Sequence, residues 1–72
     1  MLSKTMQDAI NQQVNKELYS SYVYLSMAAY FENQNLPGAA QWMRKQSVEE
    51  AEHGMKFFEF LIERGGAVLL QA

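Results

Sequence analysis

The 72-residue sequence predicts an all-α fold, an antiparallel hairpin of two long helices. Apolar residues recur at steps of four and three over residues 5–32 and again over 37–64, which is typical of helices that pack along one face. A polar stretch at 33–36 interrupts the pattern, and two long helices joined by so short a connection fold back on one another. We expect one domain, 1–72, with helices at 5–32 and 37–64, a turn at 33–36 and a tail at 65–72.

The ends of both helices carry recognisable signals. Ser3 and Thr5 are candidate N-caps of the first helix. Asn35 is expected to cap the second helix, and Pro37 suits its first turn, where a missing N–H costs nothing. The pair Gly65-Gly66 is expected to end that helix in a left-handed turn.

Composition excludes several classes of protein. The chain has no cysteine, so it contains no disulfide framework and no thiolate metal site. Six Lys and Arg against eight Asp and Glu, with no basic patch, give no support for nucleic-acid binding. The longest uncharged run, residues 18–31, is shorter than the roughly 20 residues of a membrane span, so no membrane partner is expected. The N-terminus lacks the apolar run of a signal peptide, and we expect a cytoplasmic protein.

Each predicted helix has a seam of residues at the four-three steps. The seams are Ile10, Val14, Glu17, Ser21, Tyr24, Ala28 and Phe31, and Ala39, Met43, Gln46, Glu50, His53, Phe57 and Phe60. Glu17 does not suit an apolar interface, because a buried, unpaired carboxylate is costly. Either Glu17 lies at the edge of a bundle or in a simple ion pair, or a metal ion compensates its charge.

The spacing of Glu50 and His53 favours a metal ion. Residues three apart project from one face of a helix, so this carboxylate and this imidazole can bind one ion together. With the turn centred near residues 34 and 35, residues at equal height in the two helices have numbers that sum to about 69. Glu17 reaches 67 with Glu50 and 70 with His53, so all three are expected at one level of the interface.

These residues belong to longer motifs that resemble a known family. The motifs are Glu17-Leu18-Tyr19-Ser20-Ser21 with Tyr24, Gly38-Ala39-Ala40, Trp42-Met43-Arg44-Lys45-Gln46, Glu49-Glu50-Ala51-Glu52-His53 and Glu63-Arg64-Gly65-Gly66. Together they resemble the N-terminal half of a bacterial non-haem ferritin. Members of that family are four-helix bundles with a di-iron site built from Glu and Glu-x-x-His ligands.

The resemblance implies specific roles for four residues. Glu17 and His53 would bind one iron, and Glu50 would bridge toward a second. Tyr24 matches the tyrosine beside the di-iron centre, where it would hydrogen-bond a ligand carboxylate or supply an electron. An aromatic residue that simply fills a layer of the bundle is an equal alternative for Tyr24.

Two further positions bear on which cofactors the resemblance implies. Glu49 matches an acidic position that some bacterial ferritins use for a third iron, although a solvated surface charge is the alternative. Ala51 stands where haem-containing ferritins have a methionine, so no haem is expected. Oxygen and imidazole ligands suit iron, and also zinc or manganese as substitutes.

A ferritin subunit has four long helices, and this sequence has two. A lone hairpin would leave apolar surface uncovered, including the tail 65–72, which we expect to pack along a partner or to lead into further chain. A homodimer would rebuild the ferritin-like four-helix bundle, with Glu17, Glu50 and His53 from each copy. The expected function is iron handling and storage with ferroxidase-type oxidation of Fe(II), so the chain is an enzyme only if the dimer completes the site. A truncated or engineered fragment that only assembles as a helical bundle, and a larger cage, are the alternatives.

Overall fold

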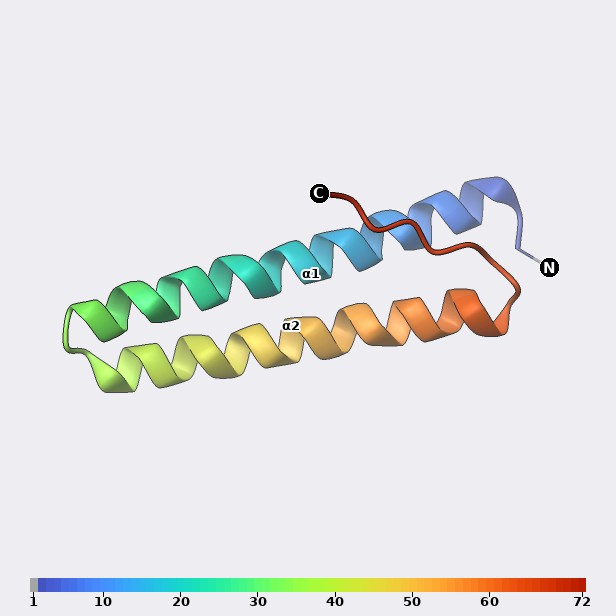
Figure 1. Ribbon diagram of the computed structural model, residues 1–72. Helices are drawn as coiled ribbons and strands as arrows, with labels where there is room; N and C mark the ends of the chain where they lie inside the picture. The colour runs from blue at the N-terminus through green and yellow to red at the C-terminus, as the bar shows by residue number, and fades with distance from the viewer. Residues whose placement is uncertain (1) are drawn as a thin grey trace.

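The chain is an antiparallel hairpin of two helices, as the sequence predicts. The computed structural model describes residues 2–72, with α1 at Lys4–Asn33 and α2 at Pro37–Glu63 (Figure 1). The hairpin measures 50 × 19 × 12 Å, so it is two helices wide and about one helix thick. Neither helix within residues 2–72 combines the length and the apolar character that a membrane crossing requires.

The open end of the hairpin is fixed by one cap at each helix. The hydroxyl of Ser3 accepts a hydrogen bond from the N–H of Met6 at 3.1 Å, so Ser3 is the N-cap of α1 and Thr5 lies inside the helix. At the end of α2, Gly65 has a φ of 72°, the left-handed conformation expected there.

The turn between the helices differs from the expected one. Asn35 has a φ of 58°, its N–H donates to the carbonyl of Glu32 at 3.1 Å, and the N–H of Leu36 donates to Phe31 at 2.9 Å. This pair of bonds is a helix C-terminal motif, in which Asn is tolerated because it enters the left-handed region more readily than most residues. The prediction that Asn35 caps α2 is therefore wrong: Asn35 ends α1, and Leu36 precedes α2 without a side-chain cap.

The buried residues of α2 lie along one line and are mostly small. They recur every seven positions, at Ala40, Ser47, Gly54 and Leu61, and the first three are small. Small side chains let two helices approach closely, and a Cβ built on Gly54 would lie only 3.2 Å from a methyl carbon of Leu18 on α1. The α2 seam expected from the sequence lies one residue before this line, and its members are half-buried or exposed.

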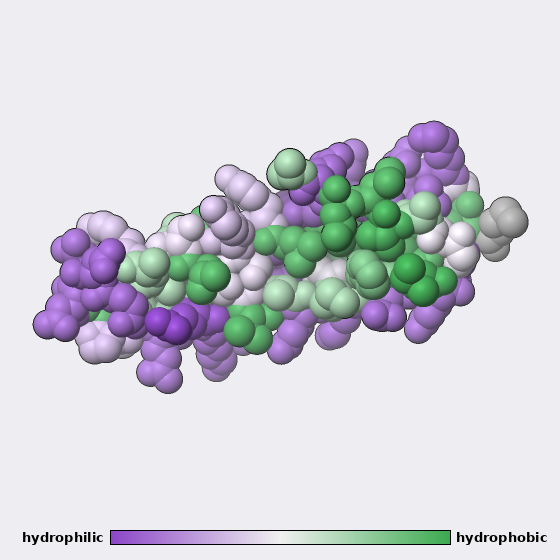
Figure 2. Space-filling model, viewed as in Figure 1, coloured by the Kyte–Doolittle hydropathy of each residue, from purple (hydrophilic) through white to green (hydrophobic). Residues whose placement is uncertain are grey.

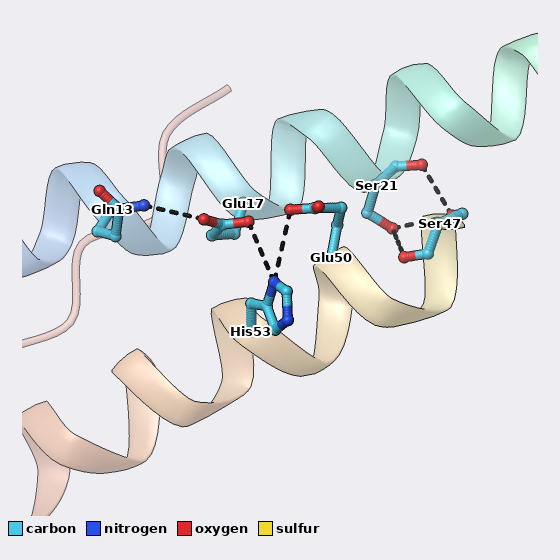
Figure 3. Close-up of polar contacts among 6 residues, drawn as sticks. All are labelled: Gln13, Glu17, Ser21, Ser47, Glu50 and His53. Atoms are coloured by element: carbon cyan, nitrogen blue, oxygen red, sulfur yellow. Dashed lines mark hydrogen bonds and ion pairs between the residues drawn. The ribbon is translucent and has the colours of Figure 1, made fainter. Parts of the chain in front are cut away.

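A pair of serines fixes the register of the two helices. The hydroxyl of Ser21 donates to the carbonyl of Ser47 at 2.7 Å, and the hydroxyl of Ser47 donates to the carbonyl of Ser21 at 2.8 Å (Figure 3). Their numbers sum to 68, close to the value expected from the position of the turn. Each helix thus binds the backbone of the other at mid-length, which specifies the relative height of their side chains.

The tail after α2 turns back and runs along α1 (Figure 1). It lies against a helix of its own chain, which the sequence did not predict. Figure 2 shows apolar side chains gathered on this face, over the half of the molecule that carries the tail. Leu69 and Leu70 of the tail are both 62% exposed.

Candidate metal centre

Glu17, Glu50 and His53 converge between the helices at mid-length. Glu17 comes from the middle of α1, and Glu50 and His53 lie one turn apart on α2 (Figure 3). Each offers a ligand atom, and these three atoms lie within 4.8 Å of one another. The structure therefore brings together the three residues that the sequence places at one level.

The distances fit donors that share an ion. Nδ1 of His53 lies 3.8 Å from Oε2 of Glu17 and 3.8 Å from Oε2 of Glu50, beyond hydrogen-bonding range. An ion held about 2.1 Å from each donor separates two donors by about 3 Å at right angles and by about 4 Å on opposite sides. Two carboxylates and an imidazole at these separations can therefore hold a first-row transition-metal ion.

The two carboxyl groups perturb each other. A hydrogen bond between them lowers the pKa of Glu17 and raises the pKa of Glu50. This is the behaviour of two neighbouring carboxyl groups that titrate as a pair, in which Glu17 ionises more readily than Glu50. A cation between them would favour the ionised form of both groups.

Solvent reaches the three side chains unequally. The side chains of Glu17 and Glu50 are 16% and 23% exposed, whereas that of His53 is 52% exposed. One face of the cluster is thus covered by the hairpin, and the face with the imidazole is open.

Gln13 orients Glu17, a role that the sequence reasoning missed. Its Nε2 donates to Oε1 of Glu17 at 2.9 Å from one helical turn away (Figure 3). The other carboxylate oxygen of Glu17 is the one nearest to His53. The sequence signal for this hydrogen bond was an amide four residues before a carboxylate, a spacing that places the two side chains side by side on a helix.

Gly54 is the second residue that the sequence reasoning missed. It is buried beside His53, and a Cβ at this position would lie 3.5 Å from the Cβ of Glu17 and 3.2 Å from Leu18. The absence of a side chain here lets α1 approach α2 at the level of the cluster. The available signal was the seven-residue recurrence of small residues at Ala40, Ser47 and Gly54.

Tyr24 and Glu49 lie outside the cluster. Tyr24 is half-buried on α1, two turns beyond Glu17, and within residues 2–72 its hydroxyl forms no hydrogen bond with the three candidate ligands. Glu49 is half-buried and precedes Glu50, but it contributes no atom to the group of converging donors.

Comparison with known proteins gives the same family as the motifs. Residues 7–72 match the family model described as a ferritin-like domain. A bacterial non-haem ferritin of Bacteroides fragilis is 47% identical over 66 residues, covering 92% of this chain and 42% of the relative. A ferritin of Pacifastacus leniusculus is 45% identical over 67 residues, covering 90% of this chain and 37% of the relative.

Solved structures show the same hairpin within longer chains. An open-pore ferritin from the archaeon Archaeoglobus fulgidus superposes with a TM-score of 0.95 at 52% identity, over 99% of this chain and 43% of that one. A closed form of the Archaeoglobus fulgidus ferritin, engineered by site-directed mutagenesis, gives a TM-score of 0.96 at 51% identity, over 100% and 44%. This chain spans about two fifths of the length of these relatives. The resemblance read from the motifs is confirmed, and the chain belongs to the ferritin-like family.

Proposed function

We propose that the hairpin binds Fe(II) through Glu17, Glu50 and His53, and that two copies together complete a di-iron site that oxidises it. The observation that carries this proposal is the convergence of three metal-competent atoms within 4.8 Å at the middle of the hairpin. The chain's membership of the ferritin-like family supports a role in iron storage and handling.

A single hairpin supplies only part of such a site. Three donors leave several positions on an iron ion to water, and the imidazole side of the cluster is open. Beside Glu17 and His53 lies an open groove of about 630 Å³, lined mainly by apolar residues that include Ile10, Phe57 and Phe60. Apolar surface next to an incomplete metal site favours a partner that brings further ligands.

A second copy of the chain meets this requirement. Glu50 is the central residue of α2, and Glu17 lies close to the middle of α1. A two-fold axis across the hairpin at mid-length therefore places the clusters of two copies at the same level. The resulting four-helix bundle has four carboxylates and two imidazoles around its centre, the ligand complement of a symmetric di-iron bundle.

The chemistry follows from this ligand set. Bridging carboxylates hold two metal ions about 3.5–4 Å apart. Each Fe(II) loses one electron, and dioxygen takes up both electrons and two protons to give hydrogen peroxide. Tyr24 is proposed to lie beside the completed centre, and Glu49 is the candidate ligand for a third iron.

Iron titration tests the proposal most directly. We expect two Fe(II) per dimer, a solution mass of two chains, and oxidation of bound Fe(II) on addition of oxygen. Glu50→Gln removes a charged ligand and should abolish oxidation, whereas Glu52→Gln changes an exposed carboxylate outside the cluster and should leave it intact. A dimer that binds no iron would favour the alternative of a bundle that only self-assembles, and a monomer would contradict the shared site. Manganese and zinc suit the same donors and should compete.

A further inference from the structure

Two asparagine side chains on α1 bind the backbone of the C-terminal tail. Nδ2 of Asn11 donates to the carbonyl of Ala67 at 2.9 Å, and its Oδ1 accepts from the N–H of Leu69 at 2.9 Å. Asn15 repeats the arrangement one turn later, with Nδ2 donating to the carbonyl of Leu69 at 2.8 Å and Oδ1 accepting from the N–H of Gln71 at 2.7 Å. Each amide therefore uses both its donor and its acceptor on the main chain.

Gln7 extends the pattern by one turn in the other direction. Its Oε1 accepts from the N–H of Ala67 at 3.0 Å. The tail approaches closely at this point, because a Cβ added to Gly66 would lie 3.2 Å from the same Gln7 oxygen. Gln7, Asn11 and Asn15, which we call the amide ladder, thus occupy positions four residues apart on one face of α1.

The spacing of the amide ladder matches that of an extended peptide. Four residues of α-helix rise about 6 Å. Two residues of extended chain span about 6.6 Å. An amide at every fourth helical position therefore meets every second residue of an extended segment that runs alongside, which is the observed pairing with residues 67, 69 and 71.

The hydrogen bonds from the amide ladder are made to main-chain atoms of the tail and involve none of its side chains. Ala67, Leu69 and Gln71, whose backbones are bound, all have exposed side chains. Asn11 is only 6% exposed, and burial of such an amide is costly unless it is hydrogen-bonded. Its polar atoms are satisfied by backbone groups that every residue other than proline provides.

We propose that the amide ladder is a binding site for an extended peptide main chain, and that it holds Ala67, Leu69 and Gln71 by their backbone whatever side chains these three positions carry. The site lies on the flank of α1 that faces the tail, and Glu17, Glu50 and His53 contribute nothing to it. It holds the chain that follows α2 against α1, along which the tail runs back (Figure 1).

Amide hydrogen exchange of the full chain, followed by NMR, tests the site without any substitution. The N–H groups of Ala67, Leu69 and Gln71 are bound, whereas within residues 2–72 those of Val68 and Leu70 donate to no acceptor. We expect alternating protection, with exchange about fivefold or more slower at the three bound positions, as one hydrogen bond implies. Uniform protection, or none, along the tail would overturn the proposal.

Proline substitutions separate backbone binding from side-chain binding. Leu69→Pro removes the N–H that donates to Asn11, so it should abolish protection at Ala67 and Gln71. Leu70→Pro removes an N–H outside the ladder, so protection at Ala67 and Gln71 should persist. Leu69→Ser changes the side chain alone and should also preserve it. If Leu69→Ser released the tail as fully as Leu69→Pro, side-chain packing would hold the tail and the proposal would fail.

An amide-to-acid pair tests the helix side of the contact. Asn11→Asp keeps the shape of the side chain but replaces the donor to Ala67 with a second acceptor, so it should release the tail. Gln12→Glu makes the same chemical change one residue away, on an exposed side chain, and should leave the protection pattern unchanged. Circular dichroism of each variant reports whether α1 and α2 persist. Retained protection in Asn11→Asp with intact helices would contradict the proposal.

Discussion

Substitution of Gly54 by alanine should have two opposing effects on stability, a gain in helix propensity and a steric contact with α1. In an α-helix this change stabilises the folded state by about 0.4–1 kcal/mol, because it reduces the freedom of the unfolded chain. At Gly54, however, the new methyl group would lie 3.2 and 3.3 Å from two carbons of Leu18 and 3.5 Å from the Cβ of Glu17. Carbon atoms normally pack about 3.5–4.0 Å apart, so α1 or Leu18 must move by a few tenths of an ångström.

The contact should outweigh the gain in helix propensity. Adding one carbon to a packed interface costs about 1–3 kcal/mol. Subtracting the propensity gain leaves a net loss of about 1 kcal/mol in the free energy of unfolding for Gly54→Ala. In a domain of this size that corresponds to a decrease in Tm of about 4–8 °C. The same movement separates Glu17 from Glu50 and His53, so iron binding should also weaken.

Gly38→Ala is the matched control. Gly38 lies in the first turn of α2, and a Cβ there would meet nothing within 4 Å. We expect this variant to be as stable as the parent or more so, with unchanged iron binding. Urea unfolding at one fixed protein concentration measures both variants, since association would otherwise shift the midpoint. If Gly54→Ala stabilised the protein as much as Gly38→Ala, the close approach of the helices at this level would be refuted.

Three further substitutions test the hydrogen bonds around the cluster. Gln13→Leu removes the donor to Glu17 and should weaken iron binding about tenfold, whereas Gln12→Leu on the solvent side should not; calorimetric titration measures both. Ser47→Ala removes one hydrogen bond between the helices, worth about 1 kcal/mol, and gains about 0.5 kcal/mol of helix propensity, so urea unfolding should show a net loss of about 0.5 kcal/mol. The raised pKa of Glu50 stabilises the metal-free fold fully below the pKa of an unfolded glutamate, and this contribution is lost as pH rises through the folded-state pKa. In Glu50→Gln the metal-free protein should no longer lose this contribution to stability as pH rises, and iron oxidation should be abolished. Thermal unfolding of the metal-free protein at a series of pH values measures the change in stability.

The arrangement of the helices could be predicted because local signals agree with the global fold. The two four-three patterns and the short break at residues 33–36 specify a hairpin, and its register follows from the position of the turn. The role of Asn35 could not be predicted in the same way. The same residue type suits the start of one helix and the end of another, and only its backbone conformation, with a φ of 58°, distinguishes the two.

The candidate site was predictable to the extent that it depends on helical spacing. Glu50 and His53 share a face by their sequence separation, and Glu17 reaches them through the register of the hairpin. Gln13 and the amide ladder were missed because a glutamine or asparagine on a helix has no preferred partner in the sequence. Their roles depend on the rotamer of Glu17 and on the path of the tail, which are tertiary features.

The offset between the expected α2 seam and the observed contact explains why the cluster is half open. The helices approach each other along Ala40, Ser47 and Gly54, which are too small to hold them apart. Residues beside this line, including Glu50 and His53, are therefore turned toward the edge of the contact, where one side faces α1 and the other faces solvent. If the large apolar residues of the seam formed the contact instead, the helices would be farther apart and Glu17 would lie farther from Glu50 and His53. The small-residue line thus brings Glu17, Glu50 and His53 together and leaves the α2 seam half-buried or exposed.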